Sequence, residues 1–271
     1  MYFSDKHKNI VYKNKSLLCI GLDIHEELMP INFDRIQYLK SLIEATSDLV
    51  CAYKPNIAFF EQYGSEGMSI LKEIINYIPD DVPVILDAKR GDIGSTAQAY
   101  ARAAFDYFKA DSITLNPYFG IDSIDPFIEY KDKQSFILCR TTNNSSDELQ
   151  AKNIDGNSKL FLEVAKLSKK WNVNKNIGLV VGAMHPKEAK EIRDICPEMI
   201  FLIPGIGTQG GNLSQIVSAI SENNNQEQMI ISTSRSVIFA GDKEETNIAN
   251  YMIDVRSAAE QYKNKINNSF N

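Results

Sequence analysis

The residues of this chain that could do chemistry gather in one short run, VILDAKRGDIGSTAQAYA, at positions 84–101. Its apolar start predicts a buried strand that ends in a carboxylate, Asp87, and two residues later in an ammonium, Lys89. Side chains two apart on a strand share a face, so these opposite charges are expected to meet. A second carboxylate, Asp92, precedes a predicted helix. Because charges at the end of an apolar strand are costly unless they pair or react, the run indicates either a salt bridge with a helix cap or part of an active site.

The elements that would position this run repeat along the chain. Eight apolar stretches have the length and composition of strands, at 17–22, 49–53, 84–86, 112–115, 136–138, 177–181, 200–203 and 229–232. Amphipathic stretches that favour helices include 33–46, 65–77, 94–108, 157–171, 186–195 and 246–263. Strands that are apolar on both faces and alternate with helices are typical of parallel sheets. Eight such units in 271 residues predict an α/β fold, a (β/α)8 TIM barrel, forming a single domain over residues 1–271 with a frayed, Asn-rich tail after Lys263.

In such a barrel the active site lies at the carboxyl ends of the strands. Nearly every predicted strand ends there in polar or charged residues: Asp23, Lys54, Asn56, Asp87, Lys89, Asn116, Arg140, Thr141, Thr142 and the run Thr233–Ser236. Each one alone could cap a helix or satisfy a contact at the rim. Together they favour an active site over a set of structural contacts.

The ends of the last two predicted strands indicate an anion site. The run PGIGTQGG, from Pro204 to Gly211, has glycines that let backbone N–H groups approach a ligand, and Gln209 adds an amide donor. Arg235 follows the next strand with a guanidinium suited to a bidentate phosphate contact. Barrels commonly hold phosphate with these two loops, and the longer one could close over a substrate.

Composition excludes several classes of function. A net charge of −6 argues against a surface for nucleic acid or an anionic membrane, and no apolar run reaches the length of a membrane span. The polar start of the chain is not expected to be a signal peptide. Four widely spaced cysteines are expected to be buried, reduced thiols of a cytoplasmic protein. The three histidines form no metal-ligand spacing, and His25 is expected at a solvated helix start.

With these motifs together, the chain resembles the orotidine 5'-phosphate decarboxylases, in particular the longer, type 2 bacterial branch. The resemblance covers essentially the whole chain and is carried by DAKRGDIGSTA, by TLNPYFGIDSIDPF from Thr114, by PGIGTQGG and by GLD in the first strand. It implies a homodimeric barrel, free of metal and cofactor, that converts orotidine 5'-phosphate to uridine 5'-phosphate and CO2 in pyrimidine synthesis.

The resemblance also implies roles for individual residues. Lys54, Asp87, Lys89 and Asp92 correspond to the charged catalytic tetrad, and Asp92 would reach the partner subunit's site together with Ile93 and Thr96. Thr142 stands where the family often has a serine that bonds the pyrimidine. The remaining substrate contacts would come from Asp23 and Asn56 near the ribose, and from Pro204, Gln209, the backbone of Ser234, and Arg235 around the phosphate.

The chemistry of this reaction explains why a cation is needed. Loss of CO2 leaves an electron pair at C6 of the pyrimidine in an orbital that the ring delocalises little. Lys89 is the candidate to stabilise this carbanion and then protonate it, and the flanking carboxylates favour its charged form.

Two other functions fit parts of the pattern. A Mg²⁺-dependent sugar-phosphate decarboxylase or aldolase of the same superfamily would keep Asp87, Lys89 and Asp92, but it would need an acidic metal ligand where this chain has Lys54. A non-catalytic nucleotide-binding barrel would not need the whole tetrad, and here no member is lost.

Overall fold

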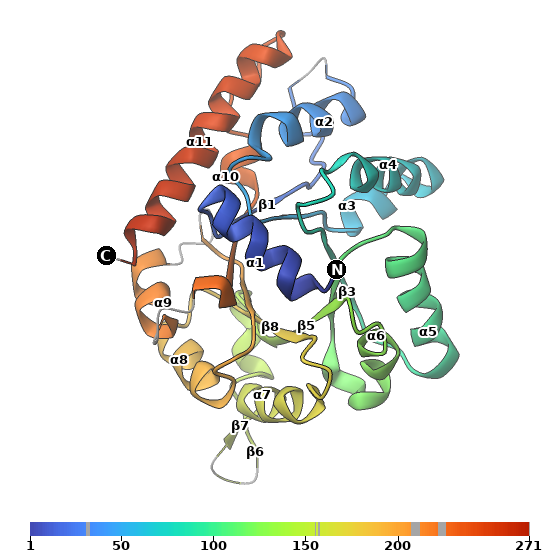
Figure 1. Cartoon of the computed structure of the whole chain (residues 1–271), viewed down its shortest axis with the longest axis vertical. Coiled ribbons are helices and arrows are strands. Elements are labelled where there is room, and N and C mark those ends of the chain that lie inside the picture. Colours follow the sequence, from blue (N-terminus) through green and yellow to red (C-terminus); the bar gives the residue numbers. More distant parts are fainter. Residues whose placement is uncertain (31–32, 155, 157, 207–211, 222–225, 271) are drawn as a thin grey trace.

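Eight parallel strands form a nearly closed barrel in the computed structural model, which describes residues 1–30, 33–154, 156, 158–206, 212–221 and 226–270. The strands are β1 (Leu18–Gly21), β2 (Ala52–Lys54), β3 (Ile85–Arg90), β4 (Ser112–Leu115), β5 (Gln134–Arg140), β8 (Ile177–Val181), β9 (Phe201–Ile203) and β10 (Met229–Thr233). They follow one another around the barrel in the order β2-β1-β10-β9-β8-β5-β4-β3. The predicted (β/α)8 architecture is therefore confirmed (Figure 1).

The barrel closes at a seam between β2 and β3. There the two strands are joined by isolated parallel bridges, Tyr53 to Val84 and Asn56 to Asp87, rather than by a continuous ladder. The bridges place the ends of these two strands beside each other, so Lys54 and Asp87 lie on opposite sides of one seam.

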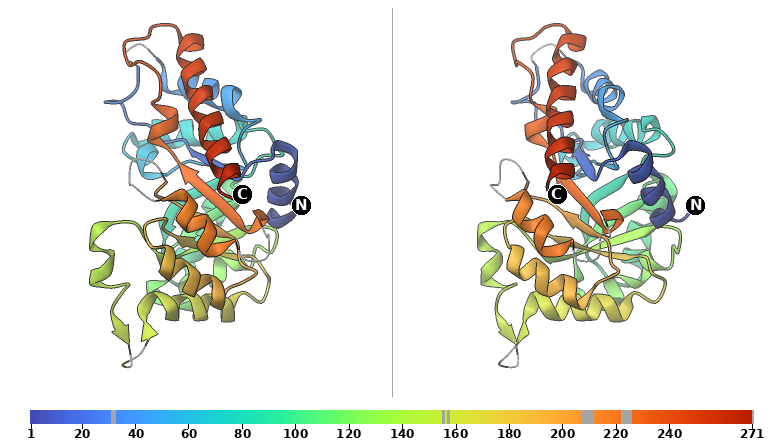
Figure 2. Two further views of the ribbon diagram at one scale, coloured as in Figure 1. Left: turned by 90° about the vertical axis from the view of Figure 1, so that its left-hand side faces the viewer. Right: turned by 60° about the vertical axis from the view of Figure 1, so that its left-hand side comes forward.

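Helices surround the barrel and follow its strands in chain order (Figure 2). The longer ones are α2 (Arg35–Thr46), α4 (Gly64–Tyr77), α5 (Gly94–Arg102), α7 (Leu160–Trp171), α8 (Pro186–Ile195), α9 (Leu213–Ile220) and α11 (Ile248–Asn268). Single-turn helices α3 (Ala58–Glu61), α6 (Asp125–Ile128) and α10 (Arg235–Ile238) lie between them, and β6 (Asn153–Ile154) pairs with β7 (Ser158–Lys159) in a small antiparallel hairpin. Most predicted helices agree with these bounds, but α5 gives way at Ala103–Tyr107 to a π-helical turn.

The two ends of the described chain are more ordered than the sequence suggests. The first helix, α1 (Phe3–Asn14), lies across the front of the barrel in Figure 1 and packs Phe3 edge-on against Phe136 of β5. The expectation of a frayed tail after Lys263 is wrong, because α11 continues to Asn268 and buries Ile266. Asn267 donates a side-chain hydrogen bond to the carbonyl of Lys15, which ties the end of α11 to the segment after α1.

The cysteines agree with the prediction. Cys19, Cys51, Cys139 and Cys196 are all free and buried. Burial raises the pKa of the Cys196 thiol to about 11, which keeps it protonated at neutral pH.

Within the described residues, no helix has both the length and the apolar character needed to span a membrane.

His7 on α1 makes stability depend on pH. It is fully buried, neither ring nitrogen has a hydrogen-bond partner among the described residues, and burial lowers the pKa of His7 to about 4. Between pH 6.5 and 4 the unfolded chain binds a proton at this residue that the folded chain does not. The free energy of unfolding should therefore fall by about 3 kcal/mol as the pH drops through this window. Urea unfolding at several pH values gives the free energy of unfolding of the wild type and of His7→Leu as a function of pH. The contribution of His7 is the difference between the slopes of these two plots between pH 6.5 and 4. Equal slopes would contradict the prediction.

Candidate active site

A cavity of about 720 Å³ opens at the carboxyl ends of the strands. Its wall draws on the ends of strands that are far apart in sequence but adjacent in the barrel. The predicted site residues found there are Asp23, Lys54, Asn56, Asp87, Lys89, Thr142, Pro204, Ser234 and Arg235. Gln209 lies outside the described residues.

Asp87 is the centre of the charged group in this cavity. Its Oδ2 accepts a hydrogen bond from Lys54 Nζ at 3.2 Å, and its Oδ1 accepts one from Lys89 Nζ at 2.6 Å. The hydroxyl of Thr114, at the neighbouring strand β4, donates to the same Oδ1 at 2.8 Å. One carboxylate therefore fixes two ammonium groups beside each other.

The burial of this group differs from one side chain to the next. The side chains of Lys54 and Asp87 are 10% and 11% exposed, whereas that of Lys89 is 49% exposed and extends to the open part of the cavity. Burial opposes ionisation of Asp87, but the charges of Lys54 and Lys89 outweigh it and hold the pKa of the carboxyl well below its usual range. Burial likewise opposes the charge of Lys54, but Asp87 and Asp23 raise the pKa of its ammonium above the ordinary value. The buried pair is therefore ionised at neutral pH.

Lys89 has an unusual backbone conformation. Its φ is 48°, in the left-handed region that costs a residue with a Cβ about 1–2 kcal/mol. The amide of Lys89 donates to Thr114 Oγ1 at 2.9 Å, and this bond offsets part of that cost. With this conformation, both Asp87 and Lys89, two residues apart at the end of β3, line the cavity.

A second carboxylate, Asp23, follows β1 and organises the neighbouring wall. Its Oδ2 accepts a hydrogen bond from the hydroxyl of Ser234 at 2.8 Å, and its Oδ1 accepts one from the backbone amide of Asn56 at 3.2 Å. A Cβ at Gly21 would lie 2.7 Å from Ser234 Cβ, so glycine is needed at this point for β1 and the end of β10 to approach. The side chain of Ser234 is thus engaged with Asp23, while its backbone begins α10 beside Arg235.

The loop after β5 contributes Thr141, Thr142 and Gln150 to the cavity wall. The amide of Thr141 donates to Gln150 Oε1 at 2.9 Å, and Gln150 Nε2 donates back to Thr141 Oγ1 at 2.7 Å. A Cβ at Gly182 would lie 2.6 Å from Cγ2 of Thr142. Gly182 therefore provides the space that the side chain of Thr142 needs.

The residues expected to act on a partner subunit's site lie apart from this cavity. Among the described residues that line it, Asp92, Ile93 and Thr96 do not occur. They lie in the loop and first turn after β3, where Asp92 Oδ1 accepts from the amide of Ile93 and the side chain of Ile93 is 54% exposed. Within one chain, only three members of the predicted tetrad come together.

Known proteins are similar to this chain in sequence and in fold. The model of the orotidine 5'-phosphate decarboxylase / HUMPS family matches residues 16–247. The chain belongs to this family. An orotidine 5'-phosphate decarboxylase of Herpetosiphon aurantiacus is 50% identical to this chain, over 88% of this chain and 90% of the relative's length. One of Dehalococcoides mccartyi is 44% identical, over 98% of the length of each protein.

Solved structures of the family agree with the fold. The OMP decarboxylase of Leishmania donovani superposes with a TM-score of 0.86 at 39% identity, covering 99% of this chain and 98% of that chain. The UMP synthase of the same organism gives a TM-score of 0.88 at 41% identity, and this chain spans 56% of its length.

Several residues around the family's site were not singled out from the sequence. Thr114 supports both Asp87 and Lys89, and Gln150 holds the loop after β5. The expectation for His25 is wrong: it lies in a turn rather than a helix, lines the cavity and packs its ring 4.2 Å from that of Phe59. A pattern of polar residues at strand ends could have indicated Thr114, but no local signal indicated His25.

Two polar residues expected at the rim have other contacts. Asn116 is exposed and accepts a hydrogen bond from the amide of Tyr118, so it caps the short helix Pro117–Phe119. Arg140 is 1% exposed and points away from solvent into a network of hydrogen bonds.

Among the described residues, no three histidine, cysteine, aspartate or glutamate side chains form a group able to hold a metal ion.

Proposed function

We propose that this chain decarboxylates orotidine 5'-phosphate to uridine 5'-phosphate and CO2, the reaction named for its relatives. The observation that carries the proposal is the array of Lys54, Asp87 and Lys89 at the wall of a cavity that Arg235 also lines. A cation beside the reacting carbon and a cation for a remote phosphate are the two groups that this reaction requires. The alternative sugar-phosphate and non-catalytic functions have no support from the named relatives.

In the proposed reaction the bond between C6 and the carboxylate carbon breaks, and its electron pair stays on C6. The Lys89 ammonium lies beside this carbon, stabilises the developing charge and transfers a proton to it, which completes the new C–H bond. Lys89 then regains a proton from solvent. Asp87, held by Lys54 and Thr114, fixes the position of the Lys89 ammonium through the 2.6 Å hydrogen bond.

The size of the electrostatic effect shows that Lys89 cannot act alone. One unit charge at ~4 Å, with an effective dielectric constant of about 20, contributes about 4 kcal/mol. Enzymes commonly lower barriers by about 8–23 kcal/mol. The remainder is assigned to the other preorganised charges and to binding energy from the phosphate, which is used at the reacting centre.

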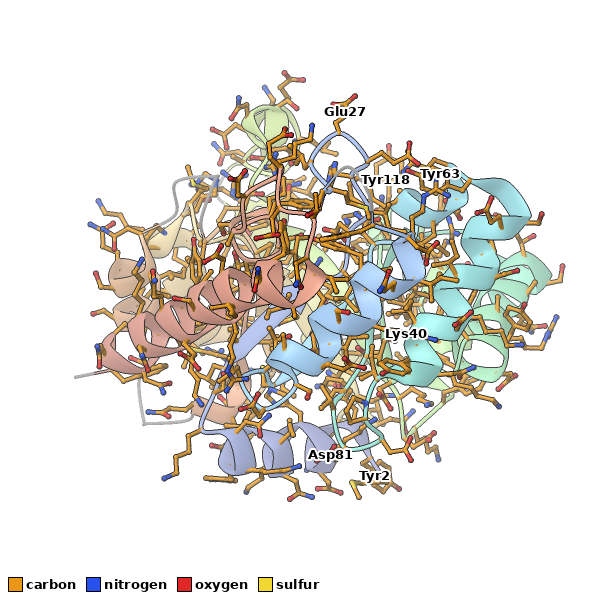
Figure 3. The ribbon with its side chains drawn as sticks, turned by 90° about the horizontal axis from the view of Figure 1, so that it is seen from above. Tyr2, Glu27, Lys40, Tyr63, Asp81 and Tyr118 are labelled. Carbon is orange, nitrogen blue, oxygen red and sulfur yellow. The ribbon has the colours of Figure 1, made fainter. Side chains whose placement is uncertain are left out.

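We further propose that the enzyme is a homodimer with shared sites. Asp92 is beside exposed apolar side chains: Ile93 is 54% exposed, and Tyr118 and Phe119, after the adjacent strand β4, are 76% and 56% exposed. The two loops are in contact, because a Cβ at Gly91 would lie 2.9 Å from the carbonyl of Asn116. Figure 3 shows Tyr118 in the upper part of the view, near Tyr63, and Tyr2 at the bottom. An exposed apolar patch next to Asp92, a carboxylate that does not line the cavity of its own chain, supports a twofold interface in which Asp92, Ile93 and Thr96 complete the partner's site.

We propose a single barrel domain over residues 1–271 with neither nucleic acid nor membrane as a partner, in keeping with the net charge of −6. Four free, buried thiols support a location in the reducing cytoplasm.

The direct test is consumption of orotidine 5'-phosphate by the purified protein in excess EDTA, followed by the change in ultraviolet absorbance and by release of CO2. Full activity is expected, because the array uses ammonium groups rather than a metal ion as its cations. The matched control is Lys89→Ala, which should be nearly inactive under the same conditions. A strict requirement for added Mg²⁺ would contradict the assignment and favour the sugar-phosphate alternative.

A further inference from the structure

Arg140, the last residue of β5, is a buried cation that the proposed reaction does not use. Its guanidinium contacts the loop that contributes Thr141, Thr142 and Gln150 to the cavity. At 1% exposure it is the largest fully buried side chain of the described protein. Burying a guanidinium is costly unless its donors are satisfied, so its partners show what it holds in place.

Three of these partners belong to the loop itself. Nη1 of Arg140 donates to Ser146 Oγ at 2.7 Å and to Gln150 Oε1 at 3.4 Å, and Nη2 donates to Asp147. Gln150 in turn exchanges hydrogen bonds with the amide and hydroxyl of Thr141. The loop is thus fastened at its middle and at its far end to one planar group, and Gln150 also holds Thr141, so Thr142 lies between two held residues, Thr141 and Ser146.

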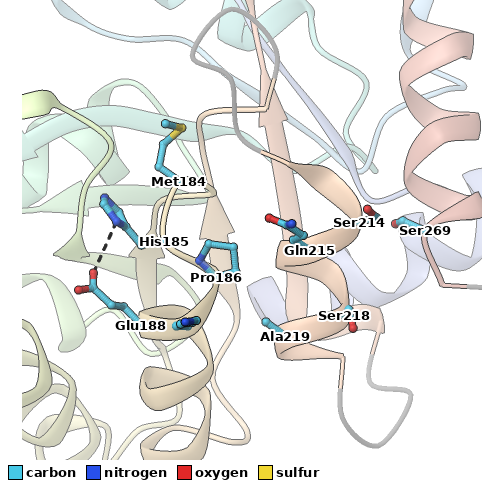
Figure 4. Close-up of a pocket in the computed structure, with 10 residues that line it drawn as sticks. Met184, His185, Pro186, Glu188, Ser214, Gln215, Ser218, Ala219 and Ser269 are labelled. Atoms are coloured by element: carbon cyan, nitrogen blue, oxygen red, sulfur yellow. Dashed lines mark ion pairs between the residues drawn. The ribbon is translucent and has the colours of Figure 1, made fainter.

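The other partners fix the guanidinium to the next part of the barrel. Nε donates to Glu188 of α8, whose other oxygen accepts from Lys159 at 3.2 Å. Burial opposes the charge of Glu188, but the hydrogen bonds from Arg140 and Lys159 hold the pKa of its carboxyl below the usual value. Burial and the Arg140 charge lower the pKa of His185, so its neutral ring can accept from Nη2, with Nδ1 at 3.4 Å. Figure 4 shows His185 and Glu188 beside each other, at the start of α8.

We propose that Arg140 is a positioning residue for recognition of the pyrimidine: it clamps the loop of residues 141–150 to Glu188 so that Thr142 and Gln150 face the base end of the cavity. This inference rests on the proposed function, because it assumes that a pyrimidine nucleotide occupies the cavity. The phosphate end is built by different elements, the loop after β9 and the start of α10, and none of the described contacts of Arg140 reaches them. Loss of the clamp should therefore weaken binding of the base and leave binding of the phosphate unchanged.

The chain offers a matched control in Arg193, another buried arginine. Its guanidinium donates to the carbonyls of Cys196, Met199 and Gln228, in the segments that precede β9 and β10, and stacks 3.6 Å from the ring centroid of Phe201. It lies at the end of the barrel away from the cavity. Arg140→Lys and Arg193→Lys make the same change: each keeps a positive charge and removes the planar fork.

The test compares two phosphorylated ligands, uridine 5'-phosphate and ribose 5-phosphate, by ligand-observed ³¹P NMR on the full-length protein. Arg140→Lys should raise the Kd of uridine 5'-phosphate about tenfold or more, as small displacements of a positioned group commonly do. It should change the Kd of ribose 5-phosphate less than about twofold, within the scatter expected of a substitution without contact to the ligand. Arg193→Lys should leave the ratio of the two Kd values unchanged, whatever it does to Tm.

A second variant tests the same clamp from the surface. Asp147 is 69% exposed in its side chain, so Asp147→Ala removes one anchor of the loop without opening the core. It should weaken binding of uridine 5'-phosphate in the same direction, by less than Arg140→Lys does. Equal effects on both ligands, or no effect of either variant, would overturn the positioning role. A wild-type protein that binds ribose 5-phosphate but not uridine 5'-phosphate would overturn the proposed function, and this inference with it.

Discussion

A mixture of Lys89→Ala and Asp92→Asn proteins is expected to recover about a quarter of wild-type activity, although each protein alone should be nearly inactive. Lys89 lies in the cavity of its own chain, where its ammonium is 2.6 Å from a carboxylate oxygen of Asp87. Asp92 lies in the loop after β3 and is not among the described residues that line that cavity. If Asp92 acts across a twofold interface, a mixed dimer has one site with both defects and one site with neither. Random pairing makes about half of the dimers mixed, each with one intact site.

The experiment depends on real exchange of subunits. Two tags of different mass on the two variants, with native mass spectrometry after mixing, measure the fraction of mixed dimers directly. Activity should rise in proportion to that fraction. If mixed dimers form and activity does not return, then Asp92 acts within its own chain and the shared-site proposal is wrong.

Arg235→Ala should reduce kcat/KM for orotidine 5'-phosphate by about a thousandfold, which corresponds to about 4 kcal/mol. Arg235 is the first residue of α10, beside Ser234, and lines the cavity that also contains the charged array. A bidentate, charge-assisted contact to a phosphate is among the stronger hydrogen-bonded interactions in proteins. Because energy from this remote contact is used at the reacting carbon, kcat as well as KM should change.

A substrate without phosphate provides the control. Wild-type enzyme should be very inefficient with orotidine, and Arg235→Ala should be no worse than wild type with that substrate, because the contact is absent in both. Arg256→Ala is a matched surface substitution, since Arg256 pairs with Asp48 on the outside of the barrel, and it should leave both substrates unaffected. Equal losses by Arg235→Ala with and without the phosphate would contradict the assigned contact.

The strands could be predicted because parallel strands in a barrel are buried on both faces and read as apolar runs. The same rule underestimated β3, which continues past Leu86 through charged residues to Arg90, and β5, which continues past Leu138 to Arg140. Helix α1 was missed for a related reason. Its buried residues Phe3, His7, Ile10 and Val11 have helical spacing, but they are separated by lysines and include a histidine.

Some contacts in the candidate site could be predicted from the spacing of residues in the sequence, and others depend on which strands lie next to each other. Pairing of Asp87 with Lys89 follows from their spacing on one strand, and the structure shows it at 2.6 Å. The support from Thr114 depends on which strand lies next to β3, and the space for Thr142 depends on Gly182, in another strand unit. Contacts of this kind arise from the register of distant strands, about which a single sequence contains no direct signal.

The seam between β2 and β3 connects catalysis to the assembly of the fold. The two strands meet through isolated bridges, and the hydrogen bond from Lys54 to Asp87 crosses the same gap. The hydrogen bond between Lys54 and Asp87 therefore forms only when β2 and β3, the two ends of the sheet, come together. Formation of the surrounding helices is not sufficient. During refolding, the return of activity should lag behind the return of helical circular dichroism, because turnover requires both closure of the barrel and the proposed pairing of subunits. A chain stalled as an open sheet would have nearly all of its secondary structure and no decarboxylase activity.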